Sequence, residues 1–163
     1  MVNGRCLFEF KPAFADGERY LIGQKSHGIT PSLVSQTPQL FLHDAPPSIS
    51  MELSHLYNRS RAVRCQEHPT ALGLATLPLN HAARAKALKL TLYQGLKGAI
   101  VRPGIEARTL THPDFISIWN MLNEAEAILF LHLLVIHDTR IQGRILPNLI
   151  GVLWETTMQA VDI

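Results

Sequence analysis

A histidine interrupts the most apolar stretch of this sequence. The stretch ILFLHLLVIHD, residues 128–138, is apolar up to His132, and a second histidine followed by an aspartate closes it. A neutral imidazole is a common metal ligand, and it is also an ordinary buried group that hydrogen-bonds to the backbone. His132 is therefore either a metal ligand or a hydrogen-bonded core histidine, and the residue alone leaves both interpretations open.

Two further polar side chains follow predicted strands. His137 lies after the apolar stretch, where it is either a substrate-side group or half of a solvated loop pair with Asp138. Arg102 ends the segment KGAIVR and is either a group for an anionic substrate or an ordinary strand-end charge. Binding groups gather at the carboxyl ends of strands in folds built of strand-helix units. Arg102 and His137 are thus candidate substrate-binding residues, and no residue is assigned as catalytic.

The other histidines show no metal-ligand spacing. His112 precedes Pro113 and Asp114, which is typical of the start of a helix. Surface positions are predicted for the remaining histidines that we considered, His43, His55, His68 and His81.

Composition excludes several classes of protein. The chain has 163 residues, 47% of them hydrophobic, with 15 Lys+Arg against 13 Asp+Glu. No basic run indicates a nucleic-acid partner, and the longest apolar run is too short to span a membrane. The two cysteines, Cys6 and Cys65, indicate neither a disulfide framework nor a cysteine-based zinc site. We expect one cytoplasmic domain, residues 1–163.

Short apolar segments alternate with helical patterns along the chain. The first predicted helix starts with an N-cap at Ser48 or Ser50, runs to about residue 68 and buries Leu53, Leu56, Tyr57 and Val63. Strands are predicted at 29–35, 71–79, 97–102 and 127–132, and further helices at 82–93, 112–126 and 148–163. This order predicts an α/β fold with a largely parallel sheet, whose strands are buried on both faces.

Five segments occur together in an order that resembles a known family. They are HGITPSLVSQTP, HPTALGLATLPL, GLKGAIVRPG, LTHPDFISIWNMLNEAEAILFLH and RILPNLIGVLWETT. Their order and approximate spacing resemble the amidohydrolase-related family that includes aminocarboxymuconate semialdehyde decarboxylase. The resemblance covers about residues 4–163. It implies a partial (β/α)8 TIM-type barrel, in which this chain supplies about strands two to five.

The resemblance also implies a chemistry. His132 occupies the position of a family ligand for a divalent metal, usually zinc. The family carries out metal-dependent decarboxylation of aromatic or unsaturated carboxylic acids, or hydrolysis in related branches. A small-molecule carboxylic acid is accordingly the implied substrate.

Several family residues are absent from this sequence. The HxH metal pair of the first strand does not occur, the chain stops before the later histidine and aspartate ligands, and Leu133 stands where proline usually follows the histidine. The segment CLFEFKP lacks the arginine of the family's F-R-E pattern. We therefore expect the isolated chain to be inactive. The alternative function is a non-catalytic half-barrel or interaction module, and its exposed strand edges would favour a homo-oligomer.

Overall fold

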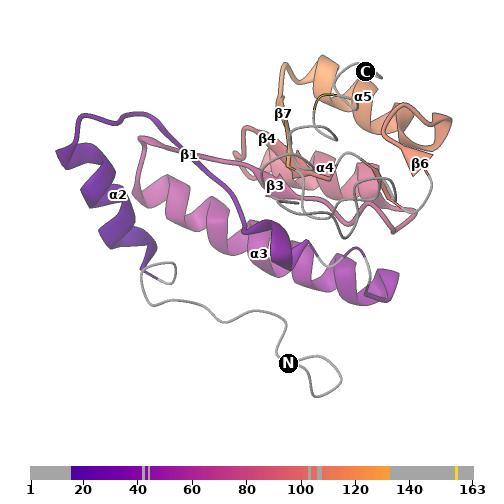
Figure 1. The fold of residues 1–163 in the computed structure, drawn as a ribbon, viewed down its shortest axis with the longest axis horizontal. Coiled ribbons are helices and arrows are strands. Elements are labelled where there is room, and N and C mark those ends of the chain that lie inside the picture. Colours follow the sequence, from indigo (N-terminus) through magenta and orange to yellow (C-terminus); the bar gives the residue numbers. More distant parts are fainter. Residues whose placement is uncertain are drawn as a thin grey trace, which may run out of the picture.

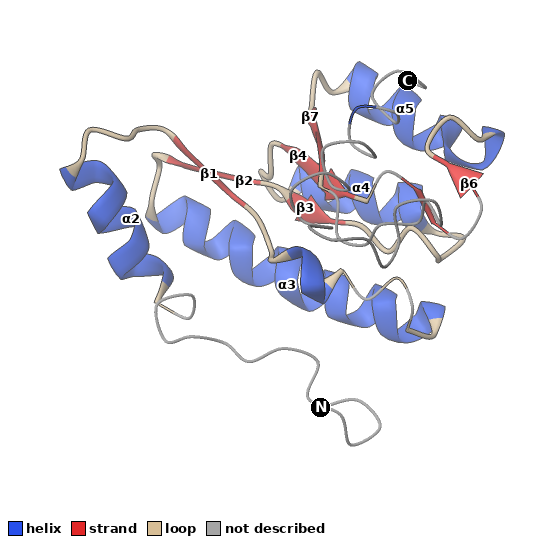
Figure 2. Ribbon diagram, viewed as in Figure 1, coloured by secondary structure: helices blue, strands red, loops and turns tan. Residues whose placement is uncertain are grey.

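Short parallel strands form the centre of the computed structural model, which describes residues 16–41, 43, 45–102, 104–105, 108–132 and 157 (Figures 1 and 2). One sheet pairs β1 with β2, and a second has the order β3-β4-β7. Only Leu74 separates β2 from β3, so the two sheets follow one another along the chain. The strands are β1 Ser32–Val34, β2 Ala71–Gly73, β3 Ala75–Thr76, β4 Gly98–Val101 and β7 Ile128–Leu131.

Helices connect successive strands. In chain order they are α2 Gly17–Ser26, α3 Pro47–Glu67, α4 Arg84–Tyr93 and α5 Ile116–Glu124, with short 3-10 turns η1 Pro38–Leu40 and η2 Pro113–Phe115. A small antiparallel hairpin, β5 Gly104–Ile105 and β6 Arg108–Thr109, follows β4. The predicted α/β fold with parallel strands is confirmed, whereas α2 and the hairpin were not predicted. No described helix is long and apolar enough to cross a membrane.

The sheet has two different faces. On the outward face, Ala75, Ala99 and Val101 pack with residues of the helical layer, among them Leu88 of α4 and Ile118 of α5. This face holds the main core, because α3 contacts α4 and α4 contacts α5 along it. The predicted helix over residues 112–126 contributes to it as η2 and α5.

The inward face is only partly covered. Leu74 and Ile100 are buried beneath Phe41, but Ile128 and Phe130 of β7 are 41% and 42% exposed. The prediction that the strands are buried on both faces was therefore wrong for β7 within the described residues. The physical reason is its place in the sheet, since β7 pairs with β4 alone among the described strands.

Gly98 allows β4 and β7 to approach closely. Its φ of +154° lies in a region that side chains rarely adopt, and a Cβ atom there would overlap the backbone of Ile128. The amide of Ile128 donates to the carbonyl of Lys97 at 2.9 Å at the same point. The start of the β4–β7 pairing therefore depends on a residue without a side chain.

Helix α3 forms over nearly the predicted residues, but its N-cap is Pro46 and not Ser48 or Ser50, which lie inside the helix, and it buries a different face from the predicted one. Leu56 and Val63, predicted to face the core, are 61% and 49% exposed. The buried residues of α3 are small or polar, namely Ser50, Ser54, Asn58, Arg61 and Ala62. The predicted apolar face was thus wrong for Leu56 and Val63, while Leu53 and Tyr57 are half-buried. The sheet presents backbone groups to α3 that need hydrogen-bonding partners, as described below.

Candidate functional site

Arg102 and His132 lie at neighbouring carboxyl ends of the sheet. Val101 is opposite Leu131 in the parallel pairing of β4 with β7, and the amide of His132 donates to the Val101 carbonyl at 2.9 Å. Side chains alternate between the two faces of a strand, so Arg102 and His132 follow Ile100 and Phe130 onto the inward face. Arg102 is 5% exposed and His132 is half-buried. The structure therefore brings these two predicted site residues to adjacent positions.

The ring of Phe130 accompanies His132 on this face. The two ring centroids are 6.1 Å apart and their planes are tilted by 52°. Phe130 precedes His132 by two residues, so both side chains project from the same face of one strand end. The other predicted residue, His137, lies outside the described residues, as does the predicted helix of residues 148–163 apart from Thr157.

His43 is buried at the same end of the sheet. Its side chain is 5% exposed, and its Nε2 atom lies 2.9 Å from the carbonyl oxygen of Leu77, just after β3. The carbonyl can only accept, so Nε2 carries the proton in this contact. The prediction that His43 is a surface residue was wrong, because the segment after η1 folds back over the end of β3. His55 is exposed, as predicted.

Asn80 ties that returning segment to the loop after β3. Its side-chain amide donates to the carbonyls of His43 and Ala45, each at 2.9 Å, and to the hydroxyl of Ser50 at 3.1 Å. One side chain thereby holds the backbone of His43 and Ala45, the start of α3 and the β3–α4 loop together. Sequence reasoning missed Asn80, because a single loop asparagine carries no distinctive spacing.

Two buried side chains of α3 complete the edge of β3. The side-chain amide nitrogen of Asn58 donates to the backbone carbonyl of Thr76 at 2.9 Å, and the backbone amide of Thr76 donates to Oδ1 of Asn58 at 2.8 Å. One turn further along α3, Arg61 donates to the Leu74 carbonyl at 2.6 Å and to Oε1 of Gln36 at 2.9 Å. These groups take the place of a neighbouring strand where β1 has ended.

Burial changes the acidity of Arg61 without neutralising it. Desolvation lowers its pKa to about 10, which still leaves the guanidinium charged at neutral pH. A buried charge needs strong partners, and the Leu74 carbonyl and the Gln36 amide oxygen provide them. The sequence signature that could have identified this pair is a polar stripe on α3, Ser54, Asn58 and Arg61, at spacings of four and three.

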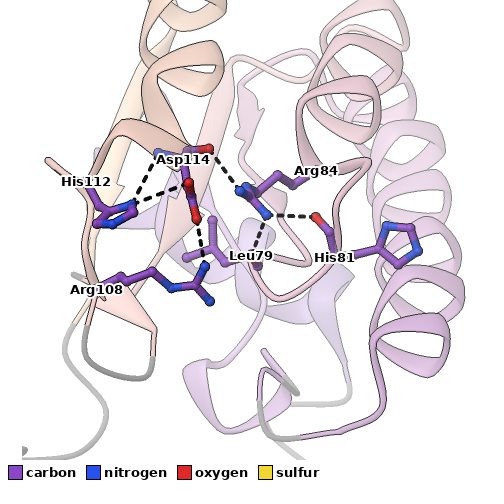
Figure 3. Close-up of polar contacts among 6 residues, drawn as sticks. All are labelled: Leu79, His81, Arg84, Arg108, His112 and Asp114. Carbon is purple, nitrogen blue, oxygen red and sulfur yellow. Dashed lines mark hydrogen bonds and ion pairs between the residues drawn. The ribbon is translucent and has the colours of Figure 1, made fainter.

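Arg84 joins the two loops that follow β3 and β4 (Figure 3). Its guanidinium donates to the carbonyls of Leu79 and His81 at 3.3 and 3.1 Å, and to the carbonyl of Asp114 at 2.9 Å. It also lies 4.9 Å from the centroid of the Phe115 ring. The loops on this side of the sheet are therefore fixed relative to one another by a single cation.

Asp114 and His112 support the same junction. The Asp114 carboxylate pairs with Arg108 at 2.7 Å, and the Asp114 amide donates to Nδ1 of His112 at 3.3 Å. His112 thus caps η2 with its own ring, which confirms the prediction that it belongs to the start of a helix.

Solved structures with similar folds include several decarboxylases. The 2,6-dihydroxybenzoate decarboxylase from Rhizobium is 19% identical, with a TM-score of 0.73 over 87% of this chain and 48% of its own. The 5-carboxyvanillate decarboxylase from Sphingomonas paucimobilis is 20% identical, with a TM-score of 0.74 over 93% and 48%. A dihydroxybenzoic acid decarboxylase from Polaromonas, with bound manganese and 2-nitroresorcinol, is 19% identical, with a TM-score of 0.73 over 88% and 48%.

This chain shares the fold of these decarboxylases. It spans about half the length of these structures, which confirms the predicted partial barrel. No protein-family model matches the sequence, and no curated protein sequence matches it.

The described half of this fold does not hold a complete metal centre. Among the described residues, no three histidine, cysteine, aspartate or glutamate side chains are close enough together to bind one ion. Catalytic zinc normally has three protein ligands. His132 can supply one of them from the end of β7, so further donors would have to come from elsewhere.

Proposed function

We propose that this chain is the central part of a metal-dependent decarboxylase that acts on aromatic or unsaturated carboxylic acids. The observation that supports it is the adjacent placement of Arg102 and His132 on the inward face, at the carboxyl ends of β4 and β7. In this proposal His132 is a ligand of a divalent metal, and Arg102 binds the substrate carboxylate. His137, which follows β7 in the chain, is a second substrate-side group.

Arg102 suits a carboxylate ligand for physical reasons. A guanidinium presents paired N–H donors that match the two oxygens of a carboxylate, and such charged hydrogen bonds are stronger than neutral ones. Arg102 is 5% exposed, so water screens its charge weakly. An anionic substrate arriving at this end of the sheet would therefore be held more firmly than at an exposed arginine.

Zinc is our proposal for the metal, although manganese is bound in the Polaromonas decarboxylase. Imidazole nitrogen is a favourable ligand for zinc, and a histidine at a rigid strand end offers it without rearrangement. The remaining donors must come from residues outside the described part or from another polypeptide. We expect the isolated chain to bind zinc weakly, since affinity requires several converging donors. A cytoplasmic location is part of the same proposal.

The second candidate function is a non-catalytic interaction module. The exposed inward side chains of Ile128 and Phe130 favour it, because apolar groups on an edge strand attract another polypeptide. In this case His132 and Arg102 would be parts of an incomplete site, and the partner would cover β7.

Complementation tests the proposed function. The chain is mixed with a polypeptide that carries the first and the sixth to eighth strands of a complete barrel of this fold. Zinc and manganese contents are measured by elemental analysis after dialysis, and carbon dioxide release is measured with 2,6-dihydroxybenzoate and 5-carboxyvanillate. We expect stoichiometric metal with the parent chain and loss of metal with His132→Ala.

The control is His55→Ala, which changes an exposed histidine on α3. It should bind metal like the parent. Stoichiometric metal that survives His132→Ala would show that the ligand assignment is wrong. A complex that binds metal but releases no carbon dioxide from either acid would favour the interaction module.

A further inference from the structure

The outer face of α4 is cationic, and no acidic side chain of its own stretch offsets the charge. The whole chain is nearly balanced, with 15 Lys+Arg against 13 Asp+Glu, but the sequence between Glu67 and Glu106 contains neither aspartate nor glutamate. Helix α4 lies in the middle of this stretch. Lys86 and Lys89 of α4 are exposed, and so is Lys97 before β4. None of these lysines makes an ion pair with another residue that the structure describes.

Two large apolar side chains lie among the lysines of this helix. Tyr93 is 91% exposed and Leu90 is 43% exposed. At 3.6 residues per turn, the two lysines and these two residues fall within about 100° of the helix circumference. The opposite side of α4 carries its buried residues, Ala87, Leu88 and Thr91. We define the α4 surface as Lys86, Lys89, Leu90 and Tyr93.

Neither the core nor the proposed metal site uses the α4 surface. The buried side of the helix packs against the sheet, and Arg84 at its start turns toward the loops that follow β3 and β4 (Figure 3). Arg102 and His132 lie on the inward face of the sheet, whereas α4 belongs to the outward layer of helices. Exposed apolar side chains gathered among unpaired cations therefore indicate a binding surface that is separate from the candidate site.

We propose that the α4 surface binds the surface of a bilayer that contains anionic phospholipids. Lysine carries a compact charge on a flexible stem, which suits loosely ordered lipid phosphates, whereas arginine suits fixed, paired hydrogen bonds. The apolar part of a lysine stem can lie beside Leu90 while its ammonium group stays among the headgroups. Tyrosine is enriched at membrane–water interfaces, where its ring is apolar and its hydroxyl is hydrated. Cations and apolar side chains on one helix face thus match both layers of such an interface.

The shape of the α4 surface favours a bilayer over other anionic partners. Acidic peptides and single-stranded nucleic acids are usually held in grooves. A groove lies along α3, beside Leu56 and Val63, but none of the four residues of the α4 surface lines it. The face of a single helix is convex, so a broad and deformable partner can contact all four side chains together.

The expected affinity follows from the charges. A lysine close to an anionic membrane strengthens binding by roughly fivefold, so Lys86, Lys89 and Lys97 together should contribute on the order of a hundredfold. Salt weakens this attraction, because the screening length falls from about 8 Å at physiological ionic strength to about 3 Å at 1 M. Binding should therefore depend on both the lipid charge and the salt concentration.

Sedimentation of the full chain with vesicles tests the proposal. We expect binding to phosphatidylcholine vesicles that contain about 30% phosphatidylserine, binding on the order of a hundredfold weaker to phosphatidylcholine alone, and release at about 1 M salt. The double variant Lys86→Gln/Lys89→Gln should bind the anionic vesicles roughly 25-fold less tightly. Tyr93→Ser should also weaken binding, because it removes the aromatic contact.

The matched control is Lys25→Gln, which removes an exposed cation from α2 and should bind like the parent. Equal affinity of the parent for both kinds of vesicle would overturn the proposal without any variant. Binding that survives the double lysine substitution would overturn it as well. Tighter binding to polyglutamate or to a single-stranded oligonucleotide than to the anionic vesicles would assign the surface to another class of partner and would also overturn it. None of these measurements depends on metal content or carbon dioxide release, so the result is independent of the proposed function.

Discussion

Replacement of Asn58 by alanine should destabilise the protein strongly, although the residue lies on a helix at the outside of the sheet. Asn58 is 1% exposed, and its amide makes two hydrogen bonds to the backbone of Thr76. Alanine would leave the amide and the carbonyl of Thr76 buried without these partners. An unsatisfied buried group costs about 1–3 kcal/mol, so with two such groups the free energy of unfolding should fall by about 2–6 kcal/mol.

Urea denaturation followed by far-ultraviolet circular dichroism measures this change. His55→Ala is the matched control, because it removes an exposed side chain one turn earlier on α3 and should change stability by less than about 0.5 kcal/mol. Asn58→Asp keeps an acceptor for the Thr76 amide but places a carboxylate against the Thr76 carbonyl. It should destabilise the protein at least as much as alanine. A loss of less than about 1 kcal/mol for Asn58→Ala would refute the view that Asn58 replaces a strand at the β3 edge.

Three further perturbations have defined outcomes. Gly98→Ala should lower the free energy of unfolding by more than about 1 kcal/mol in thermal or urea denaturation, because a Cβ atom there collides with the backbone of Ile128; an unchanged midpoint would contradict this. Phe130→Asp should reduce self-association in size-exclusion chromatography, since it charges an exposed apolar edge, and an unchanged elution profile would exclude β7 as the contact. Burial raises the pKa of the Cys65 thiol, so a smaller fraction of it is thiolate at pH 8. Iodoacetamide should therefore modify Cys65 more slowly in the folded chain than in the urea-unfolded chain. Equal rates of modification, measured by mass spectrometry, would contradict this prediction.

Elements whose side chains meet other apolar side chains were predictable from the sequence. The segment KGAIVR forms β4, and the 112–126 pattern forms η2 and α5 with Phe115, Ile118 and Leu122 buried. In these cases the pattern of apolar residues alone identifies the buried residues. The α3 pattern failed because its partner is backbone. Where β1 ends at Val34, β3 exposes peptide groups, and only polar side chains such as Asn58 and Arg61 can satisfy them.

The positions of the candidate site residues that lie at strand ends could be predicted from the sequence. Arg102 and His132 each follow an apolar run, and the parallel register places equal positions of β4 and β7 side by side. His43 could not be located from the sequence, because its burial depends on how the segment after η1 returns over Leu77. That return is a tertiary contact across 34 positions of the chain, and no local pattern encodes it.

The bridge made by Arg84 has a consequence for motion. Its guanidinium holds carbonyls of the β3–α4 loop on one side and the Asp114 carbonyl at the start of η2 on the other. Neither loop can swing away without breaking hydrogen bonds that also belong to its neighbour. The two loops are therefore coupled through Arg84, and loss of its guanidinium should loosen both. An insertion in either loop would displace the carbonyl groups that Arg84 binds there. It would therefore also disturb the Arg84 hydrogen bonds to the other loop.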